Sequence, residues 1–280
     1  MIRSPLRYPG GKSRAVERIA ALVPSFKEYR EPFVGGGSVY IHLKQKFPRR
    51  QFWINDRYTE LATFWKVLQN DSEGLIEQIV SWRSQFTNGK KLFYYLRENI
   101  GEFDETKIAA AFFVFNRITF SGTTEAGGFS AQAFEKRFTD SSVERLLKMP
   151  EILNGVKITN LDYESALNSA GESVFLFLDP PYFSATNSAL YGKNGELHKT
   201  FDHERFAENL KNCSHRWLLT YDDSPFIREL YSFAEITDWS LTYGMRNVAA
   251  DSNQQADELF ISNYDLKYTK QNQTAFSFAK

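Results

Sequence analysis

The sequence predicts an α/β fold, in which a mostly parallel sheet is covered by helices on both faces and interrupted by a helical insertion. Nearly continuous apolar runs, such as Val174–Leu178, alternate with stretches of helical spacing, as in parallel strands that are buried on both faces. Residues 59–148 instead contain one helical pattern after another. We therefore expect one sheet domain built from residues 1–58 and 149–280, and one helical domain inserted at 59–148.

The first part of the sheet domain reads as one strand–helix–strand unit. In order, we expect a helix at 13–22, a strand at 29–34, a helix at 39–46 and a strand at Gln51–Asn55. Three glycines separate the first strand from the second helix, and Asp56 directly follows the second strand. This order of strand, glycine turn, helix, strand and acid is typical of a nucleotide-binding βαβ unit.

The same periodicity predicts the remaining elements. In the insertion we expect helices at 60–68, 75–85, 91–98 and 106–115, followed by a polar loop at 116–130. In the second part of the sheet domain we expect strands at 156–160, 174–178, 216–220 and 258–262.

Composition excludes several classes of protein. The single cysteine, Cys213, excludes an internal disulfide and a cysteine-based metal site, and the four histidines lack ligand spacing, so we expect no metal. The longest apolar run is eight residues, far below the roughly 18 of a membrane span, so we expect a cytoplasmic protein without a membrane partner. The net charge is zero, but residues 1–57 carry 12 Lys and Arg against 4 Asp and Glu, which allows one basic face to meet phosphates.

The glycine turn indicates a nucleotide-like cofactor. Gly35 and Gly37 form the start of a dinucleotide fingerprint, but Tyr40 stands where that fingerprint needs Gly or Ala. Asp56 follows the next strand, where an acid accepts hydrogen bonds from ribose hydroxyls. This pattern favours an adenosyl cofactor without a pyrophosphate over NAD or FAD, and an ordinary tight turn is the third interpretation.

The segment Asp179-Pro180-Pro181-Tyr182 carries the most specific chemical signal. It directly follows a buried strand, at the edge of the sheet where α/β proteins hold their ligands. The two prolines fix the backbone, so the Asp179 carboxylate and the Pro180 carbonyl converge as hydrogen-bond acceptors. Two such acceptors bind both hydrogens of an exocyclic amine and turn its lone pair toward an electrophile, while Tyr182 offers a face for a flat base. We therefore predict catalytic roles for Asp179, Pro180 and Tyr182.

The motifs, taken in order, resemble the Dam-like α group of DNA adenine-N6 methyltransferases, also called the D12 class. The resemblance covers most of residues 4–264. It rests on segments 5–12, 31–38, 55–56, 161–163, 179–182 and 257–264. Tyr163 is a mild departure, because the family usually has Phe at this position.

The resemblance implies a Rossmann-like S-adenosylmethionine-dependent methyltransferase sheet with an inserted helical target-recognition domain. The implied reaction moves the methyl group of S-adenosylmethionine to N6 of an adenine flipped out of double-stranded DNA. The implied cofactor-binding residues are Tyr8, Gly10, Lys12, Phe33, Gly35, Gly37, Asp56, Asp162 and Tyr163. We also expect a DNA-associated monomer whose cognate restriction endonuclease is a genetic partner only.

The insertion lies where this family keeps its target-recognition region. Arg117 would pair with guanine and Asn116 with adenine, which are common bidentate contacts in the major groove. Phe120 or Phe129 would insert beside the gap that a flipped base leaves, and Arg7 occupies a position where relatives carry a basic residue near DNA. After Gly122 the sequence departs from the Dam loop, so the resemblance does not imply a GATC target.

Three alternatives remain open at this point. Any conjugated amine fits two acceptors, so methylation of cytosine N4 is the nearest rival, which the order of the motifs disfavours. Enzymes that methylate RNA or a protein glutamine amide usually have Asn in place of Asp179 and lack this insertion. A DNA-binding module without activity would lose Asp179 or the glycines, and both are present here.

Overall fold

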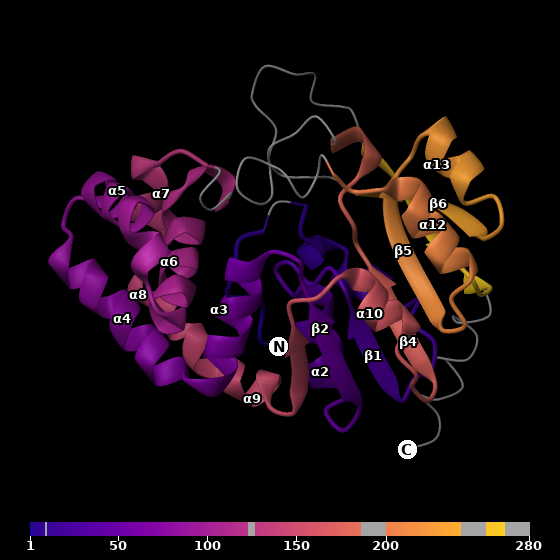
Figure 1. Cartoon of the computed structure of the whole chain (residues 1–280), viewed down its shortest axis with the longest axis horizontal. Helices are drawn as coiled ribbons and strands as arrows, with labels where there is room; N and C mark the ends of the chain where they lie inside the picture. The colour runs from indigo at the N-terminus through magenta and orange to yellow at the C-terminus, as the bar shows by residue number, and fades with distance from the viewer. Residues whose placement is uncertain (9, 123–126, 186–199, 242–255, 267–280) are drawn as a thin grey trace.

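The chain folds around one seven-stranded sheet (Figure 1). The structure is a computed structural model that describes residues 1–8, 10–122, 127–185, 200–241 and 256–266. The strands are β1 (Glu28–Glu31), β2 (Gln51–Asn55), β3 (Val156–Thr159), β4 (Val174–Leu178), β5 (Arg216–Asp222), β6 (Glu235–Leu241) and β7 (Ala256–Ser262). They lie side by side in the order β3-β2-β1-β4-β5-β7-β6.

The sheet is mostly parallel, as the apolar runs predict. The five neighbouring strands β3, β2, β1, β4 and β5 pair in parallel, whereas β7 pairs antiparallel with both β5 and β6. The strands predicted at Gln51–Asn55 and Val174–Leu178 have the bounds of β2 and β4. Strand β6 was not predicted, because an edge strand mixes polar and apolar residues and gives no apolar run. The strand order reverses between β1 and β4, and α/β sheets bind ligands at such a point.

Each face of the sheet has its own hydrophobic core. Along β4, the side chains of Phe175 and Phe177 enter one core, and those of Leu176 and Leu178 enter the other. The first core also contains residues of α1 (Val16–Ala20) and α2 (Ser38–Lys46). The second core contains residues of α10 (Tyr163–Asn168), α12 (His203–Lys211) and α13 (Pro225–Leu230). Strands covered on both faces explain why these segments are apolar throughout.

The insertion forms the helical lobe on the left of Figure 1. Its helices are α3 (Thr59–Asn70), α4 (Ser72–Gln85), α5 (Gly89–Asn99), α6 (Glu105–Ile118), α7 (Ala131–Arg137) and α8 (Asp140–Glu144), and α9 (Met149–Leu153) leads back to the sheet. Asp71, Asn88, Asp104 and Ser130 each cap the helix that follows them by accepting a backbone N–H. No helix among the described residues is long and apolar enough to cross a membrane.

Helix α6 lies at the centre of this lobe and is longer than predicted. Every residue from 109 to 118 is buried, so tertiary packing supports the helix on all sides. The helix therefore continues through Asn116 and Arg117, which the sequence analysis assigned to a loop. Both residues lie in its last turn.

Helix α3 joins the insertion to the sheet domain. The Trp65 indole donates a hydrogen bond to the Gly35 carbonyl at 3.1 Å, within the glycine turn. Gln69 donates to two backbone carbonyls near the start of β3, at 2.6 and 2.9 Å. In the same helix, Phe64 stacks on Phe113 of α6 with ring centroids 6.1 Å apart. The predicted boundary at residue 59 is the first residue of α3, but this helix contributes to both domains.

Asn55, at the end of β2, ties three strand ends together. Its Nδ2 donates to the carbonyls of Pro32 and Leu161, each at 3.0 Å, directly after β1 and close after β3. Its Oδ1 accepts from the Leu161 backbone N–H at 2.8 Å and from the Thr159 hydroxyl at 2.7 Å. The side chain is buried, and both its donors and its acceptor are fully used.

We predict that Asn55→Asp destabilises the protein strongly. The substitution keeps the shape but removes both N–H donors, and it leaves a buried carboxylate facing two carbonyl oxygens. The free energy of unfolding, measured by urea denaturation, should fall by about 3 kcal/mol.

The matched control is Asn99→Asp, because Asn99 makes a single solvent-accessible bond to the Tyr95 carbonyl. Its stability should stay within about 0.5 kcal/mol of wild type. Equal stabilities for the two variants would refute the role of Asn55.

Candidate functional site

A cavity of about 590 Å³ lies at the carboxyl ends of β1, β2, β4 and β5. This volume suits a small-molecule cofactor. The cavity is lined by all the predicted cofactor residues, namely Tyr8, Gly10, Lys12, Phe33, Gly35, Gly37, Asp56, Asp162 and Tyr163. The predicted catalytic residues Asp179, Pro180 and Tyr182 line the same cavity. The structure thus brings together two sets of residues that are far apart in sequence.

The glycine turn needs glycine because of its backbone and its packing. Gly35 and Gly37 have φ angles of +47° and +66°, which L side chains rarely adopt. A Cβ at Gly35 would lie 2.8 Å from the Tyr8 ring, and one at Gly37 would lie 3.2 Å from the Trp65 ring. The ring of Tyr8 therefore covers the turn. The missing side chains of the two glycines let these rings pack directly on the backbone, next to the cavity.

Asp56 lies beside the turn, at the end of β2. Its Oδ2 accepts the Gly35 backbone N–H at 2.9 Å, and its Oδ1 accepts the Tyr58 N–H at 3.0 Å. Burial raises the pKa of Asp56 to about 6, although these backbone hydrogen bonds act in the opposite direction. The backbone N–H groups of Gly35, Tyr58 and Arg57 bind three of the roughly four lone-pair sites of the carboxylate, so this group can still accept a hydrogen bond from a hydroxyl.

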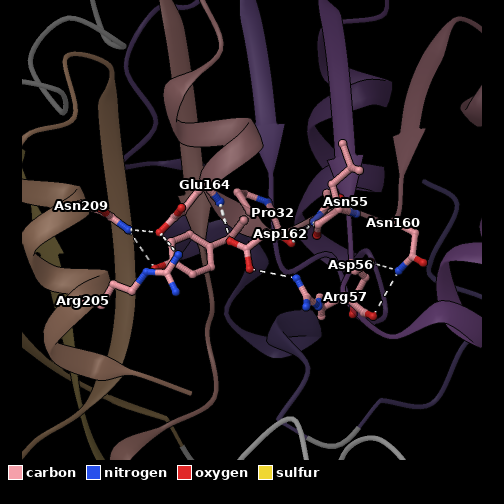
Figure 2. A network of polar contacts seen from close by, with 11 residues as sticks. Pro32, Asn55, Asp56, Arg57, Asn160, Asp162, Glu164, Arg205 and Asn209 are labelled. Atoms are coloured by element: carbon pink, nitrogen blue, oxygen red, sulfur yellow. Dashed lines mark hydrogen bonds and ion pairs between the residues drawn. The ribbon is translucent and has the colours of Figure 1, made fainter. Parts of the chain in front are cut away.

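Asp162 and Arg57 form an ion pair at the mouth of the cavity (Figure 2). The Arg57 guanidinium donates to Asp162 Oδ2 at 2.9 Å. Asp162 Oδ1 accepts the Glu164 backbone N–H at 3.1 Å and thereby caps α10. The position of Asp162 is therefore set by a helix start and by a side chain from the neighbouring β2 end.

Tyr163 belongs to an aromatic wall of the cavity. Its ring centroid lies 5.7 Å from that of Phe33, and the rings of Phe201 and Phe206 pack against both. Its hydroxyl accepts a hydrogen bond at 3.0 Å from Asn209, which lies on α12. Burial raises the pKa of Tyr163 to about 12, so the phenol stays neutral. The hydroxyl that distinguishes Tyr163 from the usual Phe thus has a partner.

Asp179 is held on one side only. Its Oδ1 lies 2.7 Å from Lys12 Nζ and accepts the Thr220 hydroxyl at 2.8 Å. The Lys12 side chain is buried, whereas that of Asp179 is 21% exposed. Among the described residues, Oδ2 has no hydrogen-bond partner, so it is available to a ligand in the cavity. Lys12, expected beside the cofactor, therefore also holds the carboxylate that is predicted to be catalytic.

Tyr182 is fixed by contacts on several sides. Its hydroxyl donates to Glu258 Oε2 of β7 at 2.9 Å, and its ring stacks on Tyr221 with centroids 5.8 Å apart. Lys12 Nζ lies 4.9 Å from the centroid of the Tyr182 ring. Asp222, at the end of β5, accepts the backbone N–H groups of Phe183 and Ser184, which directly follow Tyr182, each at 2.9 Å. The whole segment is thereby preorganised as a rigid platform.

Sequence reasoning missed three residues of this site, namely Glu31, Thr220 and Glu258. Glu31 and Glu258 stand inside quoted motifs but were given no role of their own. Glu31 is buried, lines the cavity and accepts the Tyr29 hydroxyl at 2.6 Å. The pKa of Glu31 is raised to about 8, mainly by burial and also by the nearby charge of Asp179, whereas the bond from Tyr29 acts to lower it.

The predicted DNA-binding residues have different placements. Phe120 is 60% exposed and follows α6, where it is accessible to DNA. Asn116 is completely buried, and its amide binds the Arg7 backbone at 2.9 and 2.6 Å. Arg117 is only 3% exposed and lies over the face of Phe113. The base contacts predicted for Asn116 and Arg117 do not fit these positions, because the longer α6 turns both side chains into the protein.

The described residues contain no group of three or more His, Cys, Asp or Glu side chains that could hold a metal ion.

We predict that Glu31 makes stability depend on pH in a definite direction. Its pKa in the folded protein, about 8, exceeds its ordinary value of 4.5, so the folded state binds the proton more tightly than the unfolded state. Stability should therefore decrease as the pH rises from 6 to 8, by up to about 1.4 kcal/mol per pH unit. Urea denaturation should show this slope in wild type and not in Glu31→Gln.

Asp56→Asn is the control for this experiment, because the pKa of Asp56 is about 6 and its titration is largely complete above pH 7. This variant should keep most of the wild-type slope between pH 7 and 8, since the Asp56 charge contributes less to the pKa of Glu31 than burial does. A slope that survives in Glu31→Gln would assign it to another group.

The comparisons with known proteins agree with this geometry. The family model of the D12 class N6 adenine-specific DNA methyltransferases matches residues 8–245. The chain is 31% identical over 196 residues to the Type II methyltransferase M.MjaIII of Methanocaldococcus jannaschii, covering 63% of this chain and 68% of that protein. It is 25% identical to the Type II methyltransferase M1.LlaDCHI of Lactococcus lactis subsp. cremoris, covering 94% and 96%. It is 24% identical to a DNA adenine methylase of Vibrio cholerae, covering 84% and 86%.

The match to the family model includes the glycine turn, the Asp179–Tyr182 segment and the whole helical insertion. The seven-stranded sheet, with its five parallel strands β3, β2, β1, β4 and β5, is consistent with the Rossmann-like methyltransferase fold that the motifs imply. The chain belongs to the D12 class of N6 adenine-specific DNA methyltransferases.

Proposed function

We propose that this chain moves the methyl group of S-adenosylmethionine to N6 of an adenine that is flipped out of double-stranded DNA. The observation that carries this proposal is the Asp179 carboxylate, in which Oδ1 has hydrogen-bond partners and Oδ2 is available to a ligand. This carboxylate lies beside the rigid Tyr182 ring, in the same cavity as the aromatic wall and Asp56. Membership of the D12 family supports adenine over cytosine N4 as the methylated base.

The residues of the cavity fit S-adenosylmethionine. The adenine of the cofactor would pack against Phe33 and Tyr163. The ribose hydroxyls of the cofactor would donate to Asp56, which keeps capacity to accept a hydrogen bond. The buried carboxyl group of Glu31 suits the ammonium group of the methionine part. When bound, S-adenosylmethionine supplies a methyl group on a positively charged sulfur, which a nitrogen lone pair can attack.

The chain's own residues would hold the target amine. Asp179 Oδ2 and the Pro180 carbonyl accept its two N–H groups, while Lys12 and Thr220 fix the carboxylate through its other oxygen. Tyr182 stacks on the base, and Glu258 holds the Tyr182 ring through the hydroxyl. None of these steps needs a covalent intermediate, because positioning and electrostatics supply the rate enhancement.

We also propose that the protein acts as a monomer in the cytoplasm, with a restriction endonuclease as a genetic partner only. A single chain contributes all the residues proposed to bind the base and the cofactor, which supports action as a monomer.

The direct test is methylation of unmethylated genomic DNA by the purified protein with S-adenosylmethionine, followed by single-molecule sequencing. We expect N6-methyladenine within one short sequence motif, and its loss by at least a hundredfold in Asp179→Ala. Asp223→Ala is the matched control, since Asp223 pairs with Arg228 outside the cavity, and it should keep wild-type turnover. Wild-type turnover in Asp179→Ala would refute the mechanism, and N4-methylcytosine would refute the choice of base.

We predict that Tyr182→Leu weakens the flipped state of the base. Stacking on an aromatic ring contributes about 1–3 kcal/mol per base, so kcat/KM for DNA should fall roughly 5- to 150-fold. The fluorescence of 2-aminopurine at the target position, which rises when the base leaves the stack, should rise less than in wild type.

Tyr182→Phe keeps the ring and loses the bond to Glu258, so it should retain kcat/KM to within about tenfold. Equal losses in the Leu and Phe variants would show that stacking is not the role of Tyr182.

A further inference from the structure

Four arginines converge where the insertion meets the N-terminal segment. This arginine cluster consists of Arg7, Arg117 at the end of α6, Arg137 at the end of α7, and Arg145 after α8. Arg117 is 3% exposed, and its Nε and Nη2 atoms are covered and have no hydrogen-bond partner. Arg7 is half-buried, and its Nη1 atom is likewise covered and unpartnered.

The charges that face Arg117 all have the same sign as its own. The pKa of Arg117 is lowered to about 9, mainly by burial and also by the positive charges of Arg145, Arg7 and Arg137. Burial, together with Arg137, also lowers the pKa of Arg7. Among the described residues, no carboxylate forms an ion pair with any member of the arginine cluster.

Arg30, Arg83 and Arg205, by contrast, are compensated by carboxylates. Arg30 is also buried, but it binds Glu28 at 2.7 Å and three backbone carbonyls. Arg83 and Arg205, at the surface, pair with Asp140 and Glu164. An uncompensated buried charge is strongly destabilising unless a partner of opposite charge is present. The arginine cluster therefore has the features of an anion-binding site for which the described residues provide no negative charge.

The arginine cluster is rigidly joined to the cavity. The Asn116 amide binds both the N–H and the carbonyl of Arg7, which fixes the backbone directly before Tyr8. The Tyr8 ring in turn covers the glycine turn. An anion bound to the arginine cluster would therefore be held in a fixed position relative to the base pocket.

We propose that the arginine cluster binds a phosphodiester group of the DNA backbone beside the flipped nucleotide. This inference rests on the proposed function, because that function makes DNA the polyanion at this surface. Arg137 and Arg145 are exposed and Arg7 is half-buried, so these three reach the phosphate directly. Arg117 lies beneath them and supplies positive charge and N–H donors that nothing else occupies.

The proposal predicts opposite effects of one substitution on stability and on DNA binding. Arg117→Met removes an uncompensated buried charge and keeps the apolar contact with Phe113, so the melting temperature of the free protein should rise. DNA affinity should fall roughly tenfold or more. The slope of log Kd against log salt should decrease by about 0.9, as expected for one lost phosphate contact. A structural arginine would instead give a lower melting temperature and an unchanged salt slope, which would overturn the proposal.

Two further variants complete this test. Arg137→Ala changes an exposed side chain with little risk to folding, and it should also reduce the salt slope. Arg83→Met is the matched control, because Asp140 already compensates Arg83 in the same lobe, and it should leave the slope unchanged. An unchanged slope in both Arg117→Met and Arg137→Ala would overturn the proposal.

A second arm separates DNA phosphate from free phosphate. Inorganic phosphate at constant ionic strength should raise the melting temperature of wild type and not of Arg117→Met. Loss of this effect together with a reduced DNA salt slope supports the proposal. Loss of this effect with an unchanged DNA slope would overturn it in favour of a free anion. The binding assay needs no methyl transfer, so failure of the proposed function would appear separately, as wild-type protein that binds DNA without methylating it.

Discussion

The buried Asn55 amide is the constraint on which the site depends most. Its four hydrogen bonds join the chain after β1, the end of β2 and the chain after β3. These three strand ends lead directly into the glycine turn, Asp56 and Asp162. One side chain thus sets the mutual positions of the residues that line the cofactor part of the cavity. A similar effect from hydrophobic packing alone would need contacts of comparable directionality, which packing does not supply.

Charged side chains are paired at one end of the site and unpaired at the other, among the described residues. At the base pocket, Lys12 and Asp179 compensate each other, and Thr220 satisfies the same carboxylate oxygen, so the acceptor is held before any ligand arrives. At the arginine cluster the positive charges have no counter-charge among the described residues. The first arrangement preorganises chemistry, and the second leaves binding energy for a ligand.

Much of the fold and of the cavity could be predicted from the sequence because local signals agreed with one another. The strands β2 and β4 were predicted with their bounds, since β4 is an apolar run, β2 has three apolar residues at its centre, and an aspartate directly follows each strand. The predicted roles of Asn116 and Arg117 had no such support. Their burial depends on contacts with Arg7, over a hundred residues away, and on the packing that extends α6. Glu258 was missed for the same reason, because its partner Tyr182 lies on a different element.

The two cores of the sheet have a consequence for how such a protein can diverge. The core on the Phe175 side continues through α3 into the insertion, so that the lobe and half of the sheet exclude water together. Such a lobe cannot be exchanged as an independent module, because a transplanted copy would leave the sheet face and α3 mismatched. Exposed positions of the lobe, such as Phe120, are therefore the places where substitutions disturb this shared interior least.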